Sequence, residues 1–195
     1  MVRTVIDVAG FDAKFQADPD PWNYRHSPFE AFKRRILLQA CGARQYGRVL
    51  ELACANGETS LLLARRSLRL LAVDGSATAV AVATQATGGL DRVQVRLAAL
   101  PRRMPRGPFG LIVISELLYY LSPRDFGLLL EKCRLALAPG GRVVLLHHTI
   151  FFDDAAIAPA IAQQHARAFF ARSMKQVHHR ALAHFDVAAF EKPLR

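Results

Sequence analysis

Residues 47–57 constrain the fold more than any other stretch of this chain: Gly-Arg-Val-Leu-Glu-Leu-Ala-Cys-Ala-Asn-Gly. An apolar run ends at an acid, Glu51, passes through a turn of small residues and leads into a helical pattern that starts near Glu58. Small residues suit a turn whose backbone approaches a ligand closely, and the next helix directs its free N–H groups at that ligand. The pattern therefore predicts the strand, turn and helix that open a nucleotide-type site.

A second apolar run, residues 68–74, also ends at an acid, Asp74. Asp74 follows Glu51 by roughly 20 residues, the spacing of a carboxylate that binds the hydroxyl groups of a ribose. Such a carboxylate suits bidentate hydrogen bonding. The structural alternative is that Asp74 caps the helix beginning at Ser76.

Strand-like and helix-like segments alternate along the chain. Apolar runs predict strands over residues 48–53, 69–73, 93–97, 109–115, 142–148, 177–182 and 184–191. Helical patterns cover residues 27–41, 58–67, 76–87, 122–137 and 155–173. Continuous apolar strands with helices between them are typical of a parallel sheet covered on both faces. The last two strands are too close for a helical crossover, so one of them must pair antiparallel.

Length and composition predict one globular domain over residues 1–195, of which 52% are hydrophobic. Within it, residues 46–195 are expected to form the sheet core and residues 1–45 an N-terminal lid and helix. No apolar run reaches the ~18 residues of a membrane span. The start, Met1–Gly10, lacks a signal-peptide pattern, and this predicts a cytoplasmic location. The three cysteines are widely spaced, which predicts reduced thiols and no metal site.

The net charge of +10 raises the possibility of a nucleic-acid partner. The distribution argues against it, because the basic residues cluster only in short groups at residues 33–35, 65–66 and 102–106. No basic stripe interleaved with aromatic residues is present. A solvated basic surface is the favoured interpretation, and an anionic or RNA substrate stays open as the alternative.

Four motifs, in order and spacing, resemble the class I S-adenosylmethionine-dependent methyltransferases. Residues 51–57 resemble the first motif and Asp74 the acid that ends the second strand. Residues 109–115 resemble the fourth strand, and residues 137–141 the turn into the fifth. The resemblance implies a three-layer αβα Rossmann-like fold, with a seven-stranded, mostly parallel sheet and an antiparallel C-terminal strand. It also implies S-adenosyl-L-methionine as the cofactor.

Residues 20–24 (Asp-Pro-Trp-Asn-Tyr), 27–30 and 115–121 extend the resemblance. They are similar to the NodS-like N-methyltransferases of nodulation and, equally, to the methyltransferase domains that accompany LmbE-type (PIG-L) deacetylases. The similarity implies N-methylation of a small-molecule acceptor such as an amino sugar or a chito-oligosaccharide. It leaves the oligomeric state open.

The chain departs from the family pattern at the first motif and at the third strand. Ala53 stands where the first glycine is usual and Ala55 where another often sits; a methyl group there is tolerated at negative φ and costly at positive φ. The third strand ends without the acid that many relatives use for adenine. We expect backbone groups near Ala98 and Ala99, with apolar contact, to hold adenine instead.

The predicted cofactor site joins the first motif, the acid of the second strand, the N-terminal lid and the ends of the third and fourth strands. Its residues are Trp22, Tyr24, Lys33, Glu51, Ala53, Cys54, Gly57, Asp74, Gly75, Ser76, Ala98, Ala99 and Ser115. Trp22 and Tyr24 are expected in a lid that excludes water, with Tyr24 and Lys33 near the carboxylate of the cofactor. Alternatively, Trp22 is a plug for the N-terminal helix and Lys33 lies on a solvated face.

The predicted catalytic residues are Glu116, Tyr119, His147 and His148, which follow the fourth strand or end the fifth. In open α/β sheets ligands bind outside these strand ends. Successive strand residues point to opposite faces, so only one of His147 and His148 can face the substrate. That histidine would hold or remove the proton of an ammonium acceptor, and a structural histidine is the alternative.

Four other functions stay open at this point. The net charge allows an RNA methyltransferase, and another small-molecule O- or N-methyltransferase is a second alternative. The first two strands share features with nicotinamide-dependent oxidoreductases, although the full Gly-x-Gly-x-x-Gly is missing. Ala53 and the absent third-strand acid allow a non-catalytic relative with a decayed cofactor site.

Overall fold

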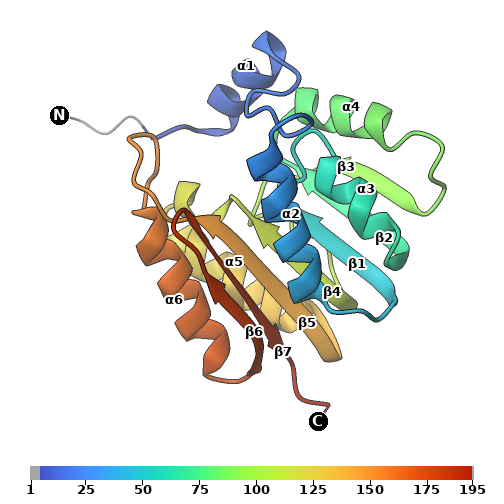
Figure 1. Ribbon diagram of the computed structural model, residues 1–195, viewed down its shortest axis with the longest axis vertical. Coiled ribbons are helices and arrows are strands. Elements are labelled where there is room, and N and C mark those ends of the chain that lie inside the picture. Colours follow the sequence, from blue (N-terminus) through green and yellow to red (C-terminus); the bar gives the residue numbers. More distant parts are fainter. Residues whose placement is uncertain (1–4, 195) are drawn as a thin grey trace.

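The computed structural model describes residues 5–194, and Figure 1 shows a twisted sheet between two layers of helices. The strands are β1 (Tyr46–Leu52), β2 (Ser67–Asp74), β3 (Val93–Leu97), β4 (Phe109–Ser115), β5 (Leu137–His148), β6 (Lys175–Ala181) and β7 (Phe185–Glu191). The helices are α1 (Val8–Ala17), α2 (Pro28–Cys41), α3 (Glu58–Ala64), α4 (Ala77–Ala86), η1 (Leu118–Tyr120, a 3₁₀ turn), α5 (Pro123–Ala136) and α6 (Pro159–Ala171).

The seven strands form one sheet in the order β3-β2-β1-β4-β5-β7-β6. The pairs from β3 to β5 are parallel, whereas β7 runs antiparallel to both β5 and β6. The short link between β6 and β7 permits only a hairpin, which reverses the last strand. The predicted fold class is confirmed: a seven-stranded, mostly parallel sheet with an antiparallel C-terminal strand, flanked by helices.

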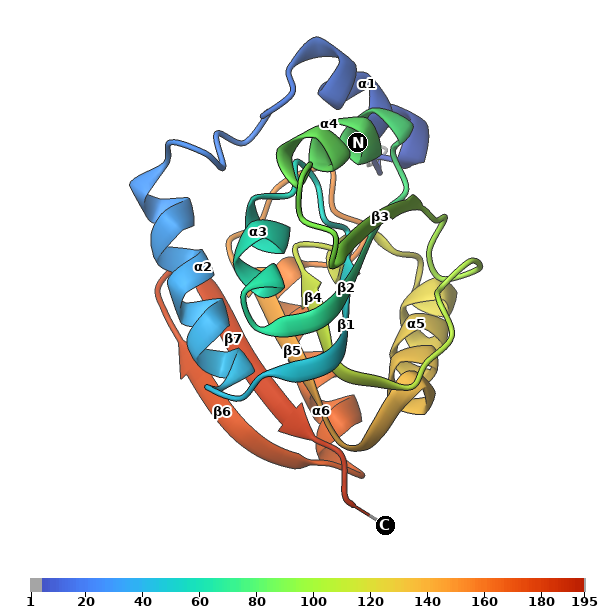
Figure 2. The same cartoon turned by 90° about the vertical axis from the view of Figure 1, so that its right-hand side faces the viewer.

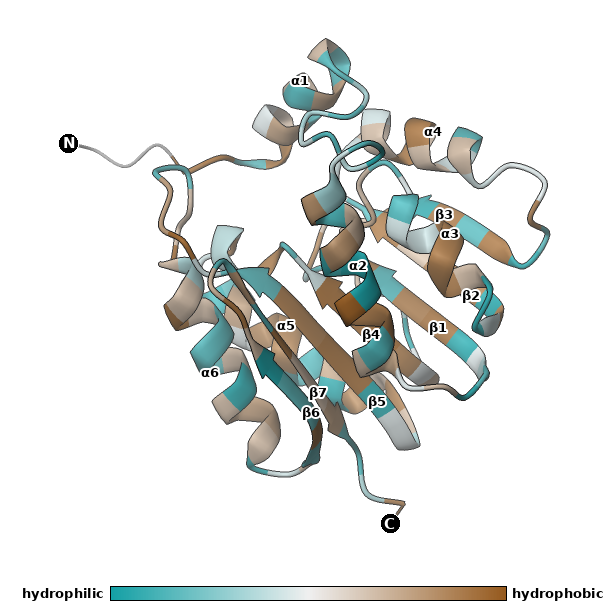
Figure 3. Cartoon of the chain, viewed as in Figure 1, coloured by the Kyte–Doolittle hydropathy of each residue, from teal (hydrophilic) through white to brown (hydrophobic). Residues whose placement is uncertain are grey.

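Each face of the sheet carries its own apolar core. Alternate residues of β4 divide between the faces: Leu111 and Val113 pack with α2 residues, and Ile112 and Ile114 pack with residues of α5 and α6. All four side chains are fully buried. Figure 2 shows α2 and α3 on one side of the sheet and α5 on the other, and Figure 3 shows the apolar central strands that they cover. Burial on both faces explains why these strands read as continuous apolar runs.

Several element boundaries differ from the sequence-based expectation. The structure adds α1, begun by Asp7, whose side chain accepts a hydrogen bond from the Gly10 N–H. α6 begins at Pro159 and not at Ala155, because proline fits the first helical turn. α3 ends at Ala64 and not at Ser67, and β2 begins at Ser67 and not at Arg69. Within residues 5–194 no helix is both long and apolar enough to cross a bilayer.

The C-terminal ends of β1, β2, β4 and β5 meet at one edge of the sheet. α1 and the start of α2 lie above that edge in Figure 1. Chain segments distant in sequence thus surround the strand ends where ligands bind in open α/β folds.

Candidate active site

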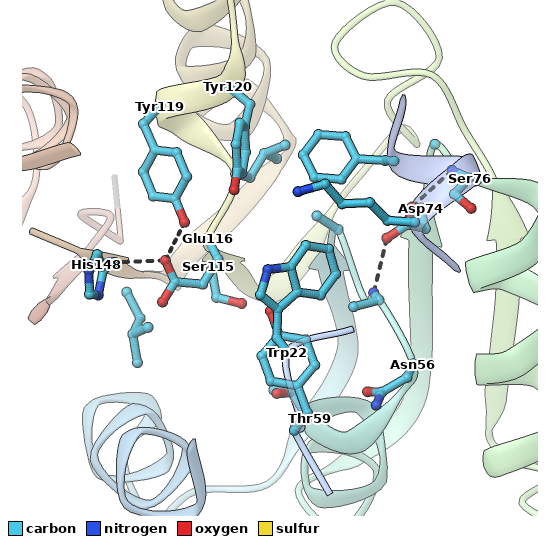
Figure 4. Close-up of a pocket in the computed structure, with 18 of the residues that line it drawn as sticks. Trp22, Asn56, Thr59, Asp74, Ser76, Ser115, Glu116, Tyr119, Tyr120 and His148 are labelled. Carbon is cyan, nitrogen blue, oxygen red and sulfur yellow. Dashed lines mark hydrogen bonds between the residues drawn. The ribbon is translucent and has the colours of Figure 1, made fainter. Parts of the chain in front are cut away.

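A cavity of about 560 Å³ opens at this edge. It is lined by the N-terminal segment, by α2 and by the ends of the central strands, as Figure 4 shows. The predicted site residues that line it are Trp22, Tyr24, Lys33, Glu51, Ala53, Asp74, Gly75, Ser76, Ala98, Ser115, Glu116, Tyr119 and His148. Cys54, Gly57, Ala99 and His147 do not line it.

The loop after β1 contains two alanines in the left-handed region, Ala53 at φ 56° and Ala55 at φ 49°. A side chain costs energy at such a φ, so the alanines in place of the family's glycines are the costly case. Gly57 follows at φ 85°, and a Cβ there would lie 3.1 Å from the Ala83 backbone. Gly57 is therefore required by helix packing and not by contact with the cavity, and Cys54 packs beside Ala83 in a small buried cluster.

Asp74 holds this loop in place. Its Oδ2 accepts a hydrogen bond from the Ala55 N–H at 2.9 Å, and its Oδ1 accepts one from the Ser76 N–H at 2.9 Å. Burial raises the pKa of Asp74, and the backbone N–H groups partly offset that effect. Each carboxylate oxygen keeps a second lone pair. Asp74 therefore joins the loop after β1 to Ser76, the N-cap of α4, and can still accept two hydroxyl groups.

Glu51 is buried behind the loop, and its Oε2 accepts a hydrogen bond from the Ser60 Oγ at 2.5 Å. Burial raises the pKa of Glu51 to about 8. Its carboxyl group is thus mainly protonated at neutral pH, and it can donate a hydrogen bond into the cavity.

The end of β3 offers little polar recognition. The Ala98 N–H donates to the Asp74 carbonyl at 2.8 Å, and the Ala99 carbonyl accepts from the Arg103 N–H at 2.8 Å. These two backbone groups are engaged within the protein. Ala98 and Leu100 line the cavity and provide apolar contact there.

Lys33 lies between two carboxylates. Its Nζ is 3.1 Å from the Glu30 Oε1 and 2.5 Å from the Glu116 Oε1. Burial opposes the charged ammonium, but Glu116 and Glu30 outweigh it and raise the pKa of Lys33. The Lys33 ammonium is thus already paired with two carboxylates of the protein. The sequence analysis had instead predicted that Lys33 would lie near the carboxylate of the cofactor.

Arg34 is a cavity residue that the sequence analysis missed. It lines the cavity, and its buried Nη1 has no hydrogen-bond partner among residues 5–194. An unpaired buried guanidinium nitrogen is costly unless a ligand fills its place. The i, i+4 spacing from Glu30 was the available signal, because it places Arg34 on the helix face that Glu30 occupies.

Glu116 follows β4 at φ 51°, a strained position for a residue other than glycine. Its Oε2 accepts from the Tyr119 hydroxyl at 2.6 Å and from the His148 backbone N–H at 2.9 Å. Burial opposes ionisation, but Lys33 and His147 lower the pKa of Glu116. Burial and Glu116 raise the pKa of Tyr119, which keeps that hydroxyl protonated. Tyr120 and Phe152 complete an aromatic wall beside Glu116.

The two histidines at the end of β5 lie on opposite faces of the sheet. His148 is half-buried and lines the cavity, and burial lowers its pKa. His147 is fully buried, and both ring nitrogens are engaged, Nε2 with the Leu118 N–H at 3.3 Å and Nδ1 with the Gln163 Oε1 at 2.7 Å. His147 therefore cannot reach the cavity, and its predicted place among the catalytic groups is corrected by this geometry.

The N-terminal segment covers the cavity. The Trp22 ring lies 5.5 Å from the Phe15 ring and 5.7 Å from the Tyr24 ring, centroid to centroid. In Figure 4 it stands with Glu116 to one side and Asp74 to the other. Trp22 thus combines both expected roles, because it covers the cavity and also anchors α1 through Phe15.

Two carboxylates join this cover to the loops that follow β1 and β2. The Asp12 Oδ1 in α1 accepts from the Ser76 Oγ at 2.6 Å and from the Thr78 N–H at 2.9 Å. The Asp20 Oδ1 accepts from the Asn56 Nδ2 at 2.9 Å. α1 had no helical signal strong enough to be predicted, so this attachment was missed.

Comparison with known proteins identifies similar methyltransferases. A family profile described as a methyltransferase domain matches residues 49–141. A solved structure described as a putative methyltransferase from Pseudomonas syringae is 31% identical, with a TM-score of 0.71, over 84% of this chain and 99% of that one.

Two NodS proteins are also similar. The structure of N-methyltransferase NodS from Bradyrhizobium japonicum WM9 with S-adenosyl-L-homocysteine has a TM-score of 0.82 at 21% identity, over 96% of this chain and all of that one. Nodulation protein S of Azorhizobium caulinodans is 26% identical over 64% of this chain and 62% of its own length. This chain therefore spans less than two thirds of that curated relative.

The fold agrees with these matches. The ligand of that NodS structure, S-adenosyl-L-homocysteine, is the product that S-adenosyl-L-methionine leaves after methyl transfer. The chain belongs to the class I S-adenosylmethionine-dependent methyltransferases.

Proposed function

We propose that this chain methylates the nitrogen of a small-molecule amine. The observation that carries the proposal is the charge of the cavity. In a chain of net charge +10, the lining holds more acidic than basic residues. Apart from Glu51, which is mainly protonated, the acids are Asp7, Glu30, Glu58, Asp74, Glu116 and Asp154, and the Lys and Arg residues are Lys14, Lys33 and Arg34.

An acidic, aromatic cavity favours cationic ligands. A sulfonium cofactor and an ammonium acceptor are both cations, and the faces of Tyr120 and Phe152 attract positive charge. An RNA phosphate would instead meet Glu30 and Glu116. The basic residues outside the cavity explain the net charge without a nucleic-acid substrate.

The cavity residues fit the cofactor. The unpaired Nη1 of Arg34 suits a carboxylate, and we assign it that role in place of Lys33. The free lone pairs of Asp74 suit the ribose hydroxyls, and Ala98 and Leu100 suit an adenine ring. When bound, S-adenosylmethionine supplies a methyl group activated by its sulfonium, so the protein needs mainly alignment and a dry site.

The residues around Glu116 would handle the acceptor. Glu116 is held as a carboxylate by Lys33, so it can orient the N–H groups of an amine. An ammonium ion is not a nucleophile, and its proton must leave before attack. His148 has a lowered pKa and is mainly neutral at pH 7, so its ring can accept that proton. Trp22 and Tyr24 exclude water above them.

Amino sugars are the acceptor class that we infer within this function. Support comes from the printed descriptions of the relatives, an N-methyltransferase NodS and a nodulation protein. The sequence resemblance to domains beside LmbE-type deacetylases points the same way, since deacetylation of an acetamido sugar frees an amine for methylation.

The test uses tritiated S-adenosylmethionine and matched acceptors: glucosamine with glucose, deacetylated chitobiose with cellobiose, ethanolamine with ethylene glycol, and bulk tRNA. We expect label only in amines, at a rate that rises with pH as the ammonium loses its proton. Glu116→Gln should lower that rate and keep cofactor affinity. Label in hydroxyl compounds or RNA would contradict the proposal, as would no label in any amine while the cofactor binds.

A further inference from the structure

We infer that a buried chain of side chains, Asp186–Gln163–His147, positions the segment that carries Glu116 and Tyr119. It runs from the antiparallel end of the sheet to η1, and none of its members lines the cavity. The inference rests on the proposed function, which places the acceptor against Glu116 and Tyr119.

The segment needs such support because its start is strained. Glu116 has a φ of 51° and persists only if its surroundings fix it. The Glu116 N–H donates to the Leu146 carbonyl at 3.0 Å, and the Tyr119 carbonyl accepts from the Ile157 N–H at 3.0 Å. Between them, the Leu118 N–H is held by the His147 Nε2 at 3.3 Å.

The hydrogen bonds among Asp186, Gln163 and His147 allow only one arrangement of protons. The Gln163 Nε2 donates to the carbonyl of Asp186 at 3.1 Å and to its Oδ1 at 2.8 Å, both of which only accept. The Gln163 Oε1 must then face the His147 Nδ1, at 2.7 Å, so that Nδ1 carries the hydrogen. The His147 Nε2 is left with a lone pair for the Leu118 N–H. A second proton on His147 would set two donors against each other.

Asp186 anchors the far end. Its Oδ2 lies 2.8 Å from the His179 Nε2 on β6 and 3.4 Å from the Arg167 Nη1 on α6. Asp186 is 7% exposed, Gln163 2% and His147 0%. Buried polar groups that are all satisfied rigidify their surroundings. The hairpin of β6 and β7 is thereby connected to the acceptor side of the cavity.

If the hydrogen bonds among Asp186, Gln163 and His147 only stabilise the fold, removing them should lower the free energy of unfolding without moving Glu116. A positioning role predicts in addition that Glu116 changes its contacts with Lys33 and Tyr119. The carboxyl titration of Glu116 separates the two if variants that share the same residue loss are compared, because His147 itself, with Lys33, Tyr119, His148, Glu30 and Tyr24, sets its environment.

The experiment compares His147→Phe, which removes both hydrogen bonds, with His147→Gln, whose amide oxygen can still accept from Leu118. Thr87→Val is the control, since Thr87 is a buried hydroxyl remote from the cavity lining. NMR follows the labelled carboxyl carbon of Glu116, assigned by its loss in Glu116→Gln. Both His147 variants lack the imidazole that itself lowers the pKa of Glu116, so the difference between them reports the hydrogen bond to Leu118. We expect a titration midpoint about one pH unit higher in His147→Phe than in His147→Gln, a tenfold change in proton affinity. Wild-type behaviour is expected in Thr87→Val.

Equal Glu116 titrations in folded His147→Phe and His147→Gln would overturn the inference. If His147→Phe does not fold, Gln163→Met decides by comparison with the wild type, because it removes the partner of Nδ1 and keeps the volume. In the wild type, long-range proton–nitrogen NMR must show the Nδ1–H form of His147; the Nε2–H form would also overturn the inference. These measurements need no acceptor, so they stand even if every amine in the methyl-transfer assay stays unlabelled.

Discussion

Four residues other than glycine have positive φ in the described part of the chain: Asn23, Ala53, Ala55 and Glu116. Ala53, Ala55 and Glu116 line the cavity, and Asn23 lies between two cavity residues of the cover. Each such residue costs of order 1–3 kcal/mol, and strain of this kind concentrates at functional sites. The loop after β1 therefore carries alanine at two positions where glycine would adopt the same backbone conformation without strain.

Glycine at Ala55 should release part of that strain. We expect Ala55→Gly to raise the free energy of unfolding by about 0.5–1 kcal/mol, since the left-handed penalty of ~1–2 kcal/mol exceeds the entropy cost of glycine. Urea unfolding measures the change. Ala81→Gly, at an exposed position in the middle of α4, is the matched control and should destabilise by about 1 kcal/mol. Equal destabilisation by both substitutions would contradict the strained geometry.

Glu51 should make stability depend on pH. Its pKa is raised to about 8 when folded, above the usual 4.5, so its contribution is full below pH 4.5 and is lost as pH rises toward 8. We expect the wild type to lose on the order of a few kcal/mol relative to Glu51→Gln between pH 5 and 8. Urea unfolding of both proteins across that range is the measurement. A constant difference would show that Glu51 is ionised in the folded protein.

Asp74 should determine cofactor affinity. Asp74→Asn removes a charged acceptor beside the loop, and loss of one charged hydrogen bond costs about 1.5–3 kcal/mol, or ten- to a hundredfold in affinity. Calorimetric titration with S-adenosylhomocysteine measures this. Asp91→Asn, on an exposed turn, should keep wild-type affinity. A folded Asp74→Asn variant that binds like the wild type would remove Asp74 from the site.

At the scale of elements, the cover formed by α1 and residues 20–24 should respond to the cofactor. It rests on the cavity through Asp12 and Asp20, which bind groups of the loops that follow β1 and β2. We expect slower amide hydrogen exchange in residues 8–24 when S-adenosylhomocysteine binds, and a smaller effect in Asp12→Asn. Exchange in β4, which is buried without ligand, serves as the internal reference. Unchanged exchange in residues 8–24 would make this segment a fixed plug.

The predictability of the elements followed their burial. β4 was predicted with its observed bounds because its residues are buried on both faces and read as one apolar run. The α5 start was predicted from Ser122, whose Oγ accepts from the Asp125 N–H. α1 was not predicted, because only Phe15 of that helix is buried and it has no clear apolar stripe. Its position depends on contacts with distant segments, which local patterns do not encode.

The residues that line the cavity were predictable where their position follows from their place at a strand end. Asp74 and Glu116 follow from that rule, as does the division of His147 and His148 between faces. The partners of Lys33 were not predictable, because Glu116 is distant in sequence and reaches Lys33 only through the fold. The unpaired nitrogen of Arg34 likewise depends on how α2 packs over the loop.

At the scale of the whole molecule, charge is divided between a basic exterior and an acidic cavity. The chain has a net charge of +10, yet acids predominate among the cavity residues. This division favours entry of cations into the cavity, and it gives the exterior a role in solubility. The central claim is that this cavity is the S-adenosylmethionine site.

Trp22 allows a direct measurement of that claim. It is the only tryptophan of the chain and it lines the cavity. The intrinsic fluorescence of the unmodified protein is titrated with S-adenosylhomocysteine and, separately, with NAD. The account predicts a saturable change with one equivalent of S-adenosylhomocysteine and none with NAD. No response to S-adenosylhomocysteine from the folded protein, or a saturable response to NAD in its place, would contradict it.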